Sequence, residues 1–353
     1  MIAIALSISI FSSCKKVVSV DSVELDNNMV ALAPGEEMTL TATVNPNDAT
    51  NKNLRWESSN PAVARVIDGL VTAVSEGEVD ITVLSDNDRR TVCKLTVTSN
   101  QMTMVSQDGR VVVIGLAGAE AESPVTIDWG DGTRDFGTIS SDINHFVHTY
   151  SRAETRTITI TGNSVTKLNC PDSHLTSLDV SKNPLLTELH CYNNRLASLD
   201  LSKNTALTLL LCNINELTDL DLRANTELTF LSCRDNQLTS LYVSGLSRLL
   251  TLWCFRNRLT NLNLSGLTLL LDLNCSYNRL TELDLSDSQW FLSNVNCTYN
   301  RLSSDAINNL FNSLHDTQIE GGKTIDINDN YGSMSELIDR SIAESKGWAV
   351  IAD

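Results

Sequence analysis

The sequence predicts a multidomain chain: two N-terminal β-sandwiches, then a solenoid of parallel β-strands with a repeat of about 21 residues, then an α-helical cap. A fixed repeat of about 20 to 50 residues is typical of a solenoid, in which each turn buries its apolar edge against its neighbours. Short alternating segments with turn residues precede the repeats, and a helical pattern follows them. The repeat is marked by seven cysteines at steps of 21 residues, the last step being 22: Cys170, Cys191, Cys212, Cys233, Cys254, Cys275 and Cys297.

The first 14 residues, MIAIALSISIFSSC, form an apolar run that ends in small residues and Cys14. The run is too short to span a bilayer. It resembles the end of a bacterial lipoprotein signal, which implies that Cys14 is lipidated and becomes the new N-terminus. An ordinary secretory signal is the alternative. The resemblance implies an extracytoplasmic, lipid-anchored protein at the outer membrane or cell surface, whose only membrane contact is the anchor.

Residues 17–99 alternate as strands do, with turn residues every 8–12 positions, in segments such as VDSVELD, MTLTATVNP, LRWESSN and EVDITVLS. This spacing favours a small β-sandwich. The stretch from LAPGEEMTL to GEVDITV resembles the bacterial immunoglobulin-like domain of group 2. Cys93 has no partner cysteine in this domain and is interpreted as buried packing. The residues expected in the core are Trp56, Val63, Val66 and Val71.

Residues 101–163 form a second candidate sandwich. VTIDWGDGT (125–133) and HTYS (148–151), followed by RTITITG, resemble a polycystic-kidney-disease-type (PKD-like) domain. Asp128, Asp131 and Asp135 suggest calcium. The segment lacks the regular Asp/Asn loop with a closing bidentate Glu that dedicated calcium loops use, and DGT is a tight-turn signal. We therefore favour a turn over a metal site.

Residues 165–302 carry the repeats, among them LTELHCYNNRL (186–196) and LTFLSCRDNQL (228–238). The alternation in LxLxC predicts a short strand with Leu and Cys pointing inward. The pattern resembles the leucine-rich repeat, LxxLxLxxNxL, with Cys in the third apolar position. Buried packing is favoured over metal binding or disulfides, because no CxxC or Cys/His clip is present. A buried asparagine can satisfy backbone groups where each turn ends: Asn194, Asn215, Asn236, Asn257, Asn278 and Asn300.

Residues 303–353 are predicted to cap the open end of the solenoid, which would otherwise expose Leu and Cys side chains. Ser304 can cap a helix whose apolar stripe includes Ile307 and Phe311. Ser333 and Glu336 form a capping box for a second helix with Leu337, Ile338 and Ile342. Gly347 is a plausible helix stop. A last strand is expected over 348–351.

The charge argues against nucleic acid as a partner. The net charge is −17, and residues 165–302 are nearly neutral, with 11 basic and 13 acidic residues. Binding to nucleic acid relies on a basic face, which this chain lacks. A ladder of Arg195, Glu216, Gln237, Arg258, Arg279 and Arg301 follows the turn asparagines. It could meet an acidic partner, although solvated surface is the favoured interpretation.

The residues between the inward Leu and Cys positions should point out onto the concave face of the solenoid. The middle of this face is unusually apolar and is flanked by charges that include Asp235. Aromatic and Arg residues dominate binding hot spots, and a large apolar patch on a surface marks an interaction site. The predicted ligand-binding residues are Leu209, Leu211, Ile214, Phe230, Arg234, Trp253, Phe255, Arg256 and Tyr277.

These features predict a non-catalytic binding or adhesion protein, without a cofactor, that recognises a protein or an extended polymer such as a glycan. The five histidines occur in no HExxH motif, and neither a GxSxG elbow nor a phosphate loop is present. Two alternatives remain open. One is a surface hydrolase acting on glycans, and the other is a purely structural spacer.

Overall fold

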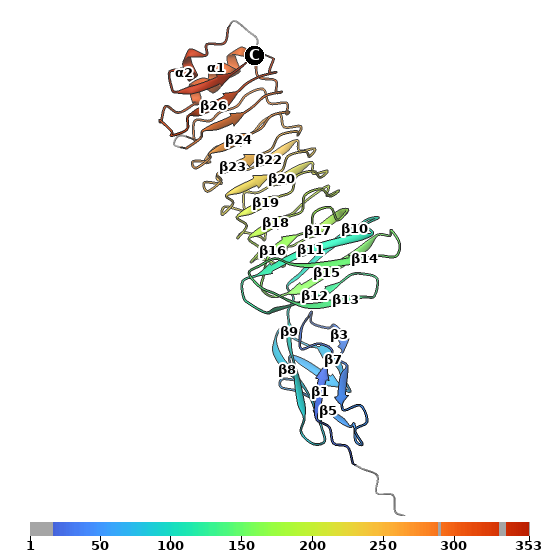
Figure 1. The fold of residues 1–353 in the computed structure, drawn as a ribbon. Coiled ribbons are helices and arrows are strands. Elements are labelled where there is room, and N and C mark those ends of the chain that lie inside the picture. Colours follow the sequence, from blue (N-terminus) through green and yellow to red (C-terminus); the bar gives the residue numbers. More distant parts are fainter. Residues whose placement is uncertain (1–16, 289–290, 332–336, 353) are drawn as a thin grey trace, which may run out of the picture. The chain divides into compact units, whose positions relative to one another are not determined.

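The computed structural model describes residues 17–288, 291–331 and 337–352. Cys14 and the predicted capping box of Ser333 and Glu336 lie outside these ranges. The chain divides into two compact units, Met1–Met29 with Pro34–Val97, and Val30–Ala33 with Thr98–Asp353, which are described separately (Figure 1). No helix in the described ranges has the length and apolar character needed to cross a membrane.

The N-terminal unit is a β-sandwich, as predicted. β8 lies between β5 and β9, β7 lies between β3 and β6, and β1 pairs with β4, all antiparallel. The segment 38–46, expected to form a single strand, is divided between two sheets because β3 pairs with β7 whereas β4 pairs with β1. The strands are β1 (Ser22–Leu25), β3 (Glu37–Thr39), β4 (Ala42–Asn45), β5 (Leu54–Ser58), β6 (Ala64–Ile67), β7 (Leu70–Ala73), β8 (Gly77–Ser85) and β9 (Arg90–Val97). β2 (Met29–Leu32) falls at the division between the two units.

The core of this sandwich includes Val63 and Val71, as predicted, but Trp56 and Val66 are only partly buried. Val66 lies on β6, the edge strand of its three-stranded sheet, where one side remains open to solvent. Trp56 packs against a small cluster that includes Val83. Cys93 is buried and free, and burial raises the pKa of its thiol to about 12.

The second unit begins with a pair of antiparallel sheets built on Met, Ile, Val and Trp side chains that are fully buried. β12 pairs with β13 and β15, β10 pairs with β15, and β11 pairs with β14. The strands are β10 (Gln101–Ser106), β11 (Val111–Gly118), β12 (Ser123–Asp128), β13 (Arg134–Ile139), β14 (Asn144–Thr149) and β15 (Arg156–Gly162).

The acidic segment after β12 is a turn, as favoured from the sequence. Asp128 accepts a hydrogen bond from the Gly130 N–H at 2.9 Å and forms an ion pair with Arg134 Nε at 2.9 Å. Asp131 accepts from the Thr133 N–H at 3.0 Å and from the Thr133 hydroxyl at 2.6 Å, and it contacts His148 Nε2 at 2.9 Å. The Thr133 hydroxyl, with a smaller contribution from His148, lowers the pKa of Asp131 to about 2.

The solenoid is continuous with this sandwich, because the first two repeat strands belong to its sheets. β16 pairs with β11, and β17 pairs with β10, both antiparallel. From β16 onward the pairing is parallel and passes through successive repeats, so that one eleven-stranded sheet runs from β14 to β27 (Figure 1). The expected domain boundary near residue 164 therefore lies inside a shared sheet. One apolar core extends from Met102 to Trp348.

From β18 to β25 each strand has three residues, and its central residue is buried. The seven repeat cysteines are buried and free, which confirms the packing interpretation. Burial raises the pKa of Cys191 and Cys254 to about 12, which keeps these thiols protonated at neutral pH. The strands are β16 (Val165–Asn169), β17 (Leu175–Asp179), β18 (Glu188–His190), β19 (Leu209–Leu211), β20 (Asp219–Asp221), β21 (Phe230–Ser232), β22 (Ser240–Tyr242), β23 (Thr251–Trp253), β24 (Asp272–Asn274) and β25 (Asn294–Asn296).

The C-terminal cap covers the end of the solenoid with α1 (Ser304–Ser313) and α2 (Ser341–Glu344), and it adds β26 (Lys323–Asp326) and β27 (Trp348–Ile351) to the parallel sheet. The α1 N-cap is Ser303 rather than Ser304, because the Ser303 hydroxyl accepts from the Ala306 N–H. α2 is shorter than predicted and leaves Leu337 and Ile338 outside it. Gly347, with φ of 82°, follows α2 and precedes β27, as predicted.

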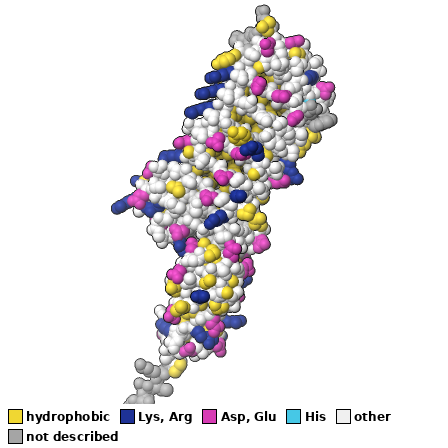
Figure 2. All heavy atoms as spheres, turned by 180° about the vertical axis from the view of Figure 1, so that it is seen from behind, with side chains coloured by type: hydrophobic (Ala, Val, Ile, Leu, Met, Phe, Trp, Pro, Cys, Tyr) yellow, Lys and Arg dark blue, Asp and Glu magenta, His cyan; other side chains and the backbone are white. Residues whose placement is uncertain are grey.

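Basic side chains stand in a row along one edge of the solenoid, toward its C-terminal end (Figure 2). Arg258, Arg279 and Arg301, which we call the arginine row, occupy equivalent positions in consecutive repeats and are all exposed. Each follows a buried turn asparagine. The net charge of −17 makes this local concentration of positive charge unusual for the chain.

Candidate functional site

The residues predicted to bind a ligand lie on the outward face of the parallel sheet, where their neighbours in each strand point into the core. In β23 the central Leu252 is fully buried whereas Thr251 and Trp253 are partly exposed, and β19 shows the same alternation. Ile214 is 40% exposed and Tyr277 is 43% exposed. We call the following residues the sheet face, and none of them is buried: Leu209, Leu211, Ile214, Phe230, Arg234, Trp253, Phe255, Arg256 and Tyr277.

The structure brings these residues together on neighbouring strands. Parallel pairing places Leu209 beside Phe230, and places the next position, Ser232, beside Trp253. The rings of Phe230 and Trp253 meet edge to face, with centroids 5.2 Å apart. Such a pair stabilises by about 0.5–1.5 kcal/mol beyond its buried area. The Trp253 indole N–H donates to Asp272 Oδ2 at 2.6 Å, so the ring is fixed while part of it stays accessible.

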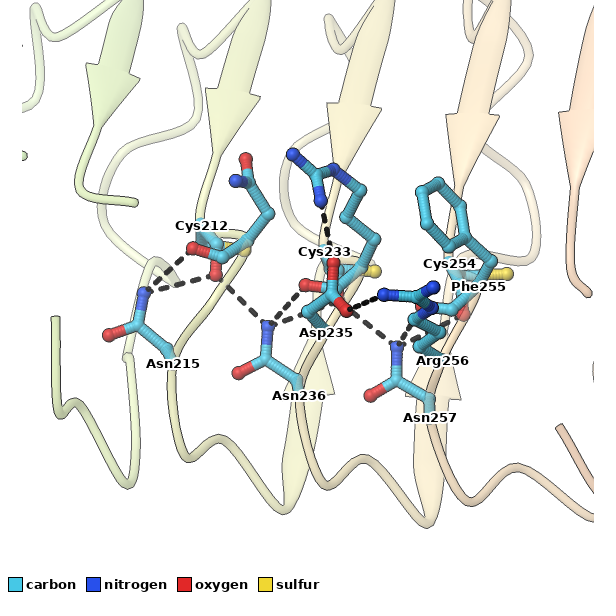
Figure 3. Close-up of polar contacts among 11 residues, drawn as sticks. Cys212, Asn215, Cys233, Asp235, Asn236, Cys254, Phe255, Arg256 and Asn257 are labelled. Atoms are coloured by element: carbon cyan, nitrogen blue, oxygen red, sulfur yellow. Dashed lines mark hydrogen bonds and ion pairs between the residues drawn. The ribbon is translucent and has the colours of Figure 1, made fainter. Parts of the chain in front are cut away.

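Arginines and further aromatic rings extend the cluster toward the turns. The Arg234 guanidinium lies 5.5 Å from the centre of the Phe255 ring, and that of Arg256 lies 5.5 Å from the centre of the Tyr277 ring. Asp235 holds both arginines, at 2.6 Å from Arg234 and 3.4 Å from Arg256 (Figure 3). Aromatic rings with an arginine fixed over them are typical of protein interaction surfaces.

Tyr299 belongs to the same cluster although the sequence analysis did not select it. Its ring stacks on Tyr277 with centroids 4.1 Å apart and planes inclined by 13°. A hydrogen bond to Asp329, with a further one to Tyr277, raises the pKa of the Tyr299 hydroxyl to about 12. The signal was present in the sequence, because Tyr299 is the next member of the repeat position that contains Arg256 and Tyr277.

An asparagine builds each turn that carries these side chains, and it is buried in every one of these turns except at Asn236, which is partly buried. Asn257 donates through Nδ2 to the carbonyls of Cys233 and Cys254, both at 3.0 Å, and its Oδ1 accepts from the Leu238 N–H at 3.0 Å (Figure 3). Equivalent bonds recur along the solenoid, as in Asn215. The predicted role of the turn asparagines is therefore confirmed. Each satisfies backbone groups of two adjacent repeats that the strand ladder leaves without partners.

The residue just before each turn asparagine, or before Ser173 in the first repeat, adopts a left-handed backbone conformation. This conformation costs an L-amino acid about 1–2 kcal/mol, and Asn and Asp tolerate it best. We call this the left-handed position. It holds Asp or Asn in four repeats and larger side chains in the other four, with φ between 53° and 55° throughout: Asp172, Asn193, Ile214, Asp235, Arg256, Tyr277, Tyr299 and Asp329.

The second end of each early repeat contains another asparagine ladder that the sequence analysis missed. Asn204 donates to the carbonyls of Val180 and Asn183, both at 2.9 Å, and Asn225 repeats the pattern one turn later. These asparagines recur at 21-residue intervals in the SKN and RAN segments, which was the available signal. They are fully buried and serve the fold.

The interactions described for the sheet face are aromatic contacts, cation–π contacts and ion pairs. Within the described ranges, no group of three or more His, Cys, Asp or Glu side chains is arranged to hold a metal ion. A polar cavity of about 700 Å³ lies between the repeats at 261–287 and the start of α1. Its lining includes Glu282, Asp284 and Asp305 and none of the sheet-face residues.

Comparison with known proteins identifies the type of the N-terminal domain. Residues 19–97 match the bacterial Ig-like domain of group 2. Three curated relatives match a segment of this chain. An α-L-arabinofuranosidase of Bifidobacterium longum subsp. longum is 40% identical over 70 residues, which is 20% of this chain and 7% of that protein. An Ig-like virion protein of Serratia phage KSP90 is 40% identical over 84 residues (23% of this chain, 33% of that protein), and a κ-carrageenase of Pseudoalteromonas carrageenovora is 42% identical over 84 residues (24% of this chain, 21% of that protein). The chain thus spans a third or less of the length of these relatives.

Two solved structures from Listeria monocytogenes are similar to part of this chain. The functional domain of InlJ, described as including a cysteine ladder, is 27% identical with a TM-score of 0.31, and the match covers 56% of this chain and 51% of that one. The internalin InlF is 16% identical with a TM-score of 0.22, covering 53% and 73%. The Ig-like prediction is confirmed for the N-terminal domain, whereas the PKD-like resemblance of residues 101–163 stays a prediction.

Proposed function

We propose that this chain is a non-catalytic binding or adhesion protein of the bacterial cell surface, and that the sheet face of its solenoid recognises a protein or an extended polymer. Lipidation at Cys14 would tether it to the membrane, with the two sandwiches acting as spacers. The Ig-like domain fits a spacer role, because similar domains occur in proteins named for unrelated activities, including two glycoside-degrading enzymes and a virion protein.

A single observation carries the proposal: the aromatic and arginine cluster on the sheet face. Phe230, Trp253, Phe255 and Tyr277 come from neighbouring turns and remain accessible, although each has a neighbour in its own turn that is fully buried. Large apolar side chains held rigid at a surface lose little conformational entropy on binding. Such anchors, with arginine beside them, contribute most of the affinity at protein interfaces.

The proposal is tested by screening the full chain against surface proteins and glycans, with wild type beside a Trp253→Ala, Phe255→Ala double variant. We expect the double variant to lose binding by about 10-fold or more, because hot-spot truncations typically cost over 1–2 kcal/mol each. The matched control is Leu185→Ala with Leu269→Ala. These leucines are 52% and 38% exposed and occupy the repeat position that also contains Glu227 and Arg248, outside the sheet face.

The outcome separates the alternatives. Equal loss in both double variants would mean that the sheet face has no special role. Failure of the wild type to bind any member of a broad ligand set would favour a structural spacer. Release of reducing ends from a glycan, abolished by Glu282→Gln in the polar cavity, would instead favour a hydrolase.

A further inference from the structure

The edge of the solenoid near the turns combines two features in the same three repeats. At the left-handed position lie Arg256, Tyr277 and Tyr299. Two residues later, beyond the buried turn asparagine, lies the arginine row. The order along each turn is therefore an accessible side chain, a buried asparagine and an exposed arginine. We call these six residues the edge stripe.

The arginine row lacks counter-ions among the described residues. Several other solenoid arginines are paired: Arg223 with Asp221 at 2.6 Å, Arg248 with Glu227 at 2.6 Å, and Arg234 with Asp235 at 2.6 Å. Arg195, an earlier member of the same repeat position, contacts His174 at 3.4 Å. None of the three arginines of the row has such an ion pair within the described part of the chain. Like charges one repeat apart, at about the 4.8 Å separation of adjacent strands, repel one another. An external anion would relieve this repulsion.

The left-handed position gives a second, independent indication. Four of its eight members are Asp or Asn, the residues that this backbone conformation favours. Arg256, Tyr277 and Tyr299 have no such preference, yet they occupy three consecutive repeats at φ of 53–55°. Unfavourable backbone conformations that persist are concentrated at functional sites. Here they place a column of stacked groups, Arg256 over Tyr277 and Tyr277 against Tyr299, beside the arginine row.

We propose that the edge stripe binds a linear acidic polysaccharide, with one guanidinium of the arginine row contacting each successive carboxylate or sulfate group. This goes beyond the proposed function, because it assigns a ligand class to a surface beside the sheet face. Arg pairs with planar carboxylates in a bidentate manner, and the regular spacing of the row matches a polymer whose charges recur along a line. An acidic globular protein without sequence repeats has no feature that would align its carboxylates at this spacing. The net charge of the chain disfavours every polyanion alike, so the distinction rests on spacing. Phosphates recur about every 3.4 Å along one strand of duplex DNA, which is closer than the spacing of about 4.8 Å between adjacent repeats.

The test measures binding of the full chain to immobilised polygalacturonate, with dextran as a neutral probe and a single-stranded DNA oligonucleotide as a different polyanion. We expect the wild type to bind polygalacturonate in a salt-sensitive manner. The triple variant Arg258→Gln, Arg279→Gln, Arg301→Gln should lose about 10-fold or more in affinity. Its affinity should also depend less on salt, because with fewer cationic contacts fewer counter-ions are released on binding.

The matched control removes the same charge elsewhere, in Lys203→Gln, Arg223→Gln, Arg248→Gln. It should change the affinity by less than about twofold. Equal losses in the two triple variants, stronger binding to DNA than to polygalacturonate, or equal binding to dextran would overturn the proposal. Polygalacturonate binding that survives the Trp253, Phe255 double variant but not the arginine triple variant would support the edge stripe as a site separate from the sheet face. Protein binding through Trp253 without polygalacturonate binding would overturn the edge-stripe proposal and leave the proposed function of the sheet face intact.

Discussion

Replacing Ile214 with Asn should stabilise the protein, although it removes an apolar side chain from the solenoid. Ile214 has φ of 55°, and a branched residue pays about 1–2 kcal/mol for this left-handed conformation. The side chain is 40% exposed, so its truncation forfeits only about 0.5–1 kcal/mol of apolar burial. Asparagine already occupies the equivalent position at Asn193, where its side-chain amide donates to Asp172. We expect a net gain of about 0.5–1 kcal/mol.

The assay is urea-induced unfolding of the full chain, followed by far-UV circular dichroism and compared with wild type at equal denaturant slope. Ile214→Val is the control, since it keeps a branched side chain in the same backbone conformation and should lower stability slightly. A destabilisation of Ile214→Asn by more than about 0.5 kcal/mol would refute the reasoning, because it would show that the left-handed position imposes no penalty on isoleucine.

Three further predictions concern the fold. Asn257→Leu should destabilise by about 3–5 kcal/mol in urea unfolding, because two carbonyls and one amide lose their buried partner; a loss below about 1 kcal/mol would contradict the ladder's role. Leu252→Ala should cost about 2–5 kcal/mol in the same assay, whereas the accessible Trp253→Ala should cost no more than about 1–2 kcal/mol; the reverse order would disprove the assigned faces. Asp131, with its pKa lowered to about 2, contributes stability above pH 4 that is lost as the pH falls toward 2. The free energy of unfolding should therefore fall less steeply between pH 4 and pH 2 in Asp131→Asn than in wild type. An unchanged pH dependence in the variant would contradict this role of Asp131.

The solenoid could be predicted from the sequence because its restraint is periodic. A cysteine every 21 residues, with leucines at fixed offsets, leaves one arrangement in which all of them are buried together. The outward positions follow from strand alternation, so the exposure of Trp253 and Ile214 could be deduced as well. The cap followed from the need to cover the last repeat.

Other features depend on contacts that no local pattern encodes. The left-handed position was not predicted, because Ile214 and Tyr277 have side chains that do not favour it and the neighbouring repeats impose it. The division of 38–46 between two sheets is set by the pairing of β3 and β4 with different partners. The Ser303 cap differs from the expected Ser304 because two adjacent serines offer the same chemistry, and the first helical amide decides between them.

Shared strands between the second sandwich and the first repeats have a mechanical consequence. With β16 and β17 bonded into the sandwich sheets, the described chain has no linker between residues 98 and 288 at which the unit could swivel. If the solenoid binds a ligand as proposed, a pulling force on that ligand would pass through a hydrogen-bonded backbone ladder rather than be absorbed by a hinge. A continuous sheet of this kind would suit a binding protein that must resist shear without rearranging its binding surface.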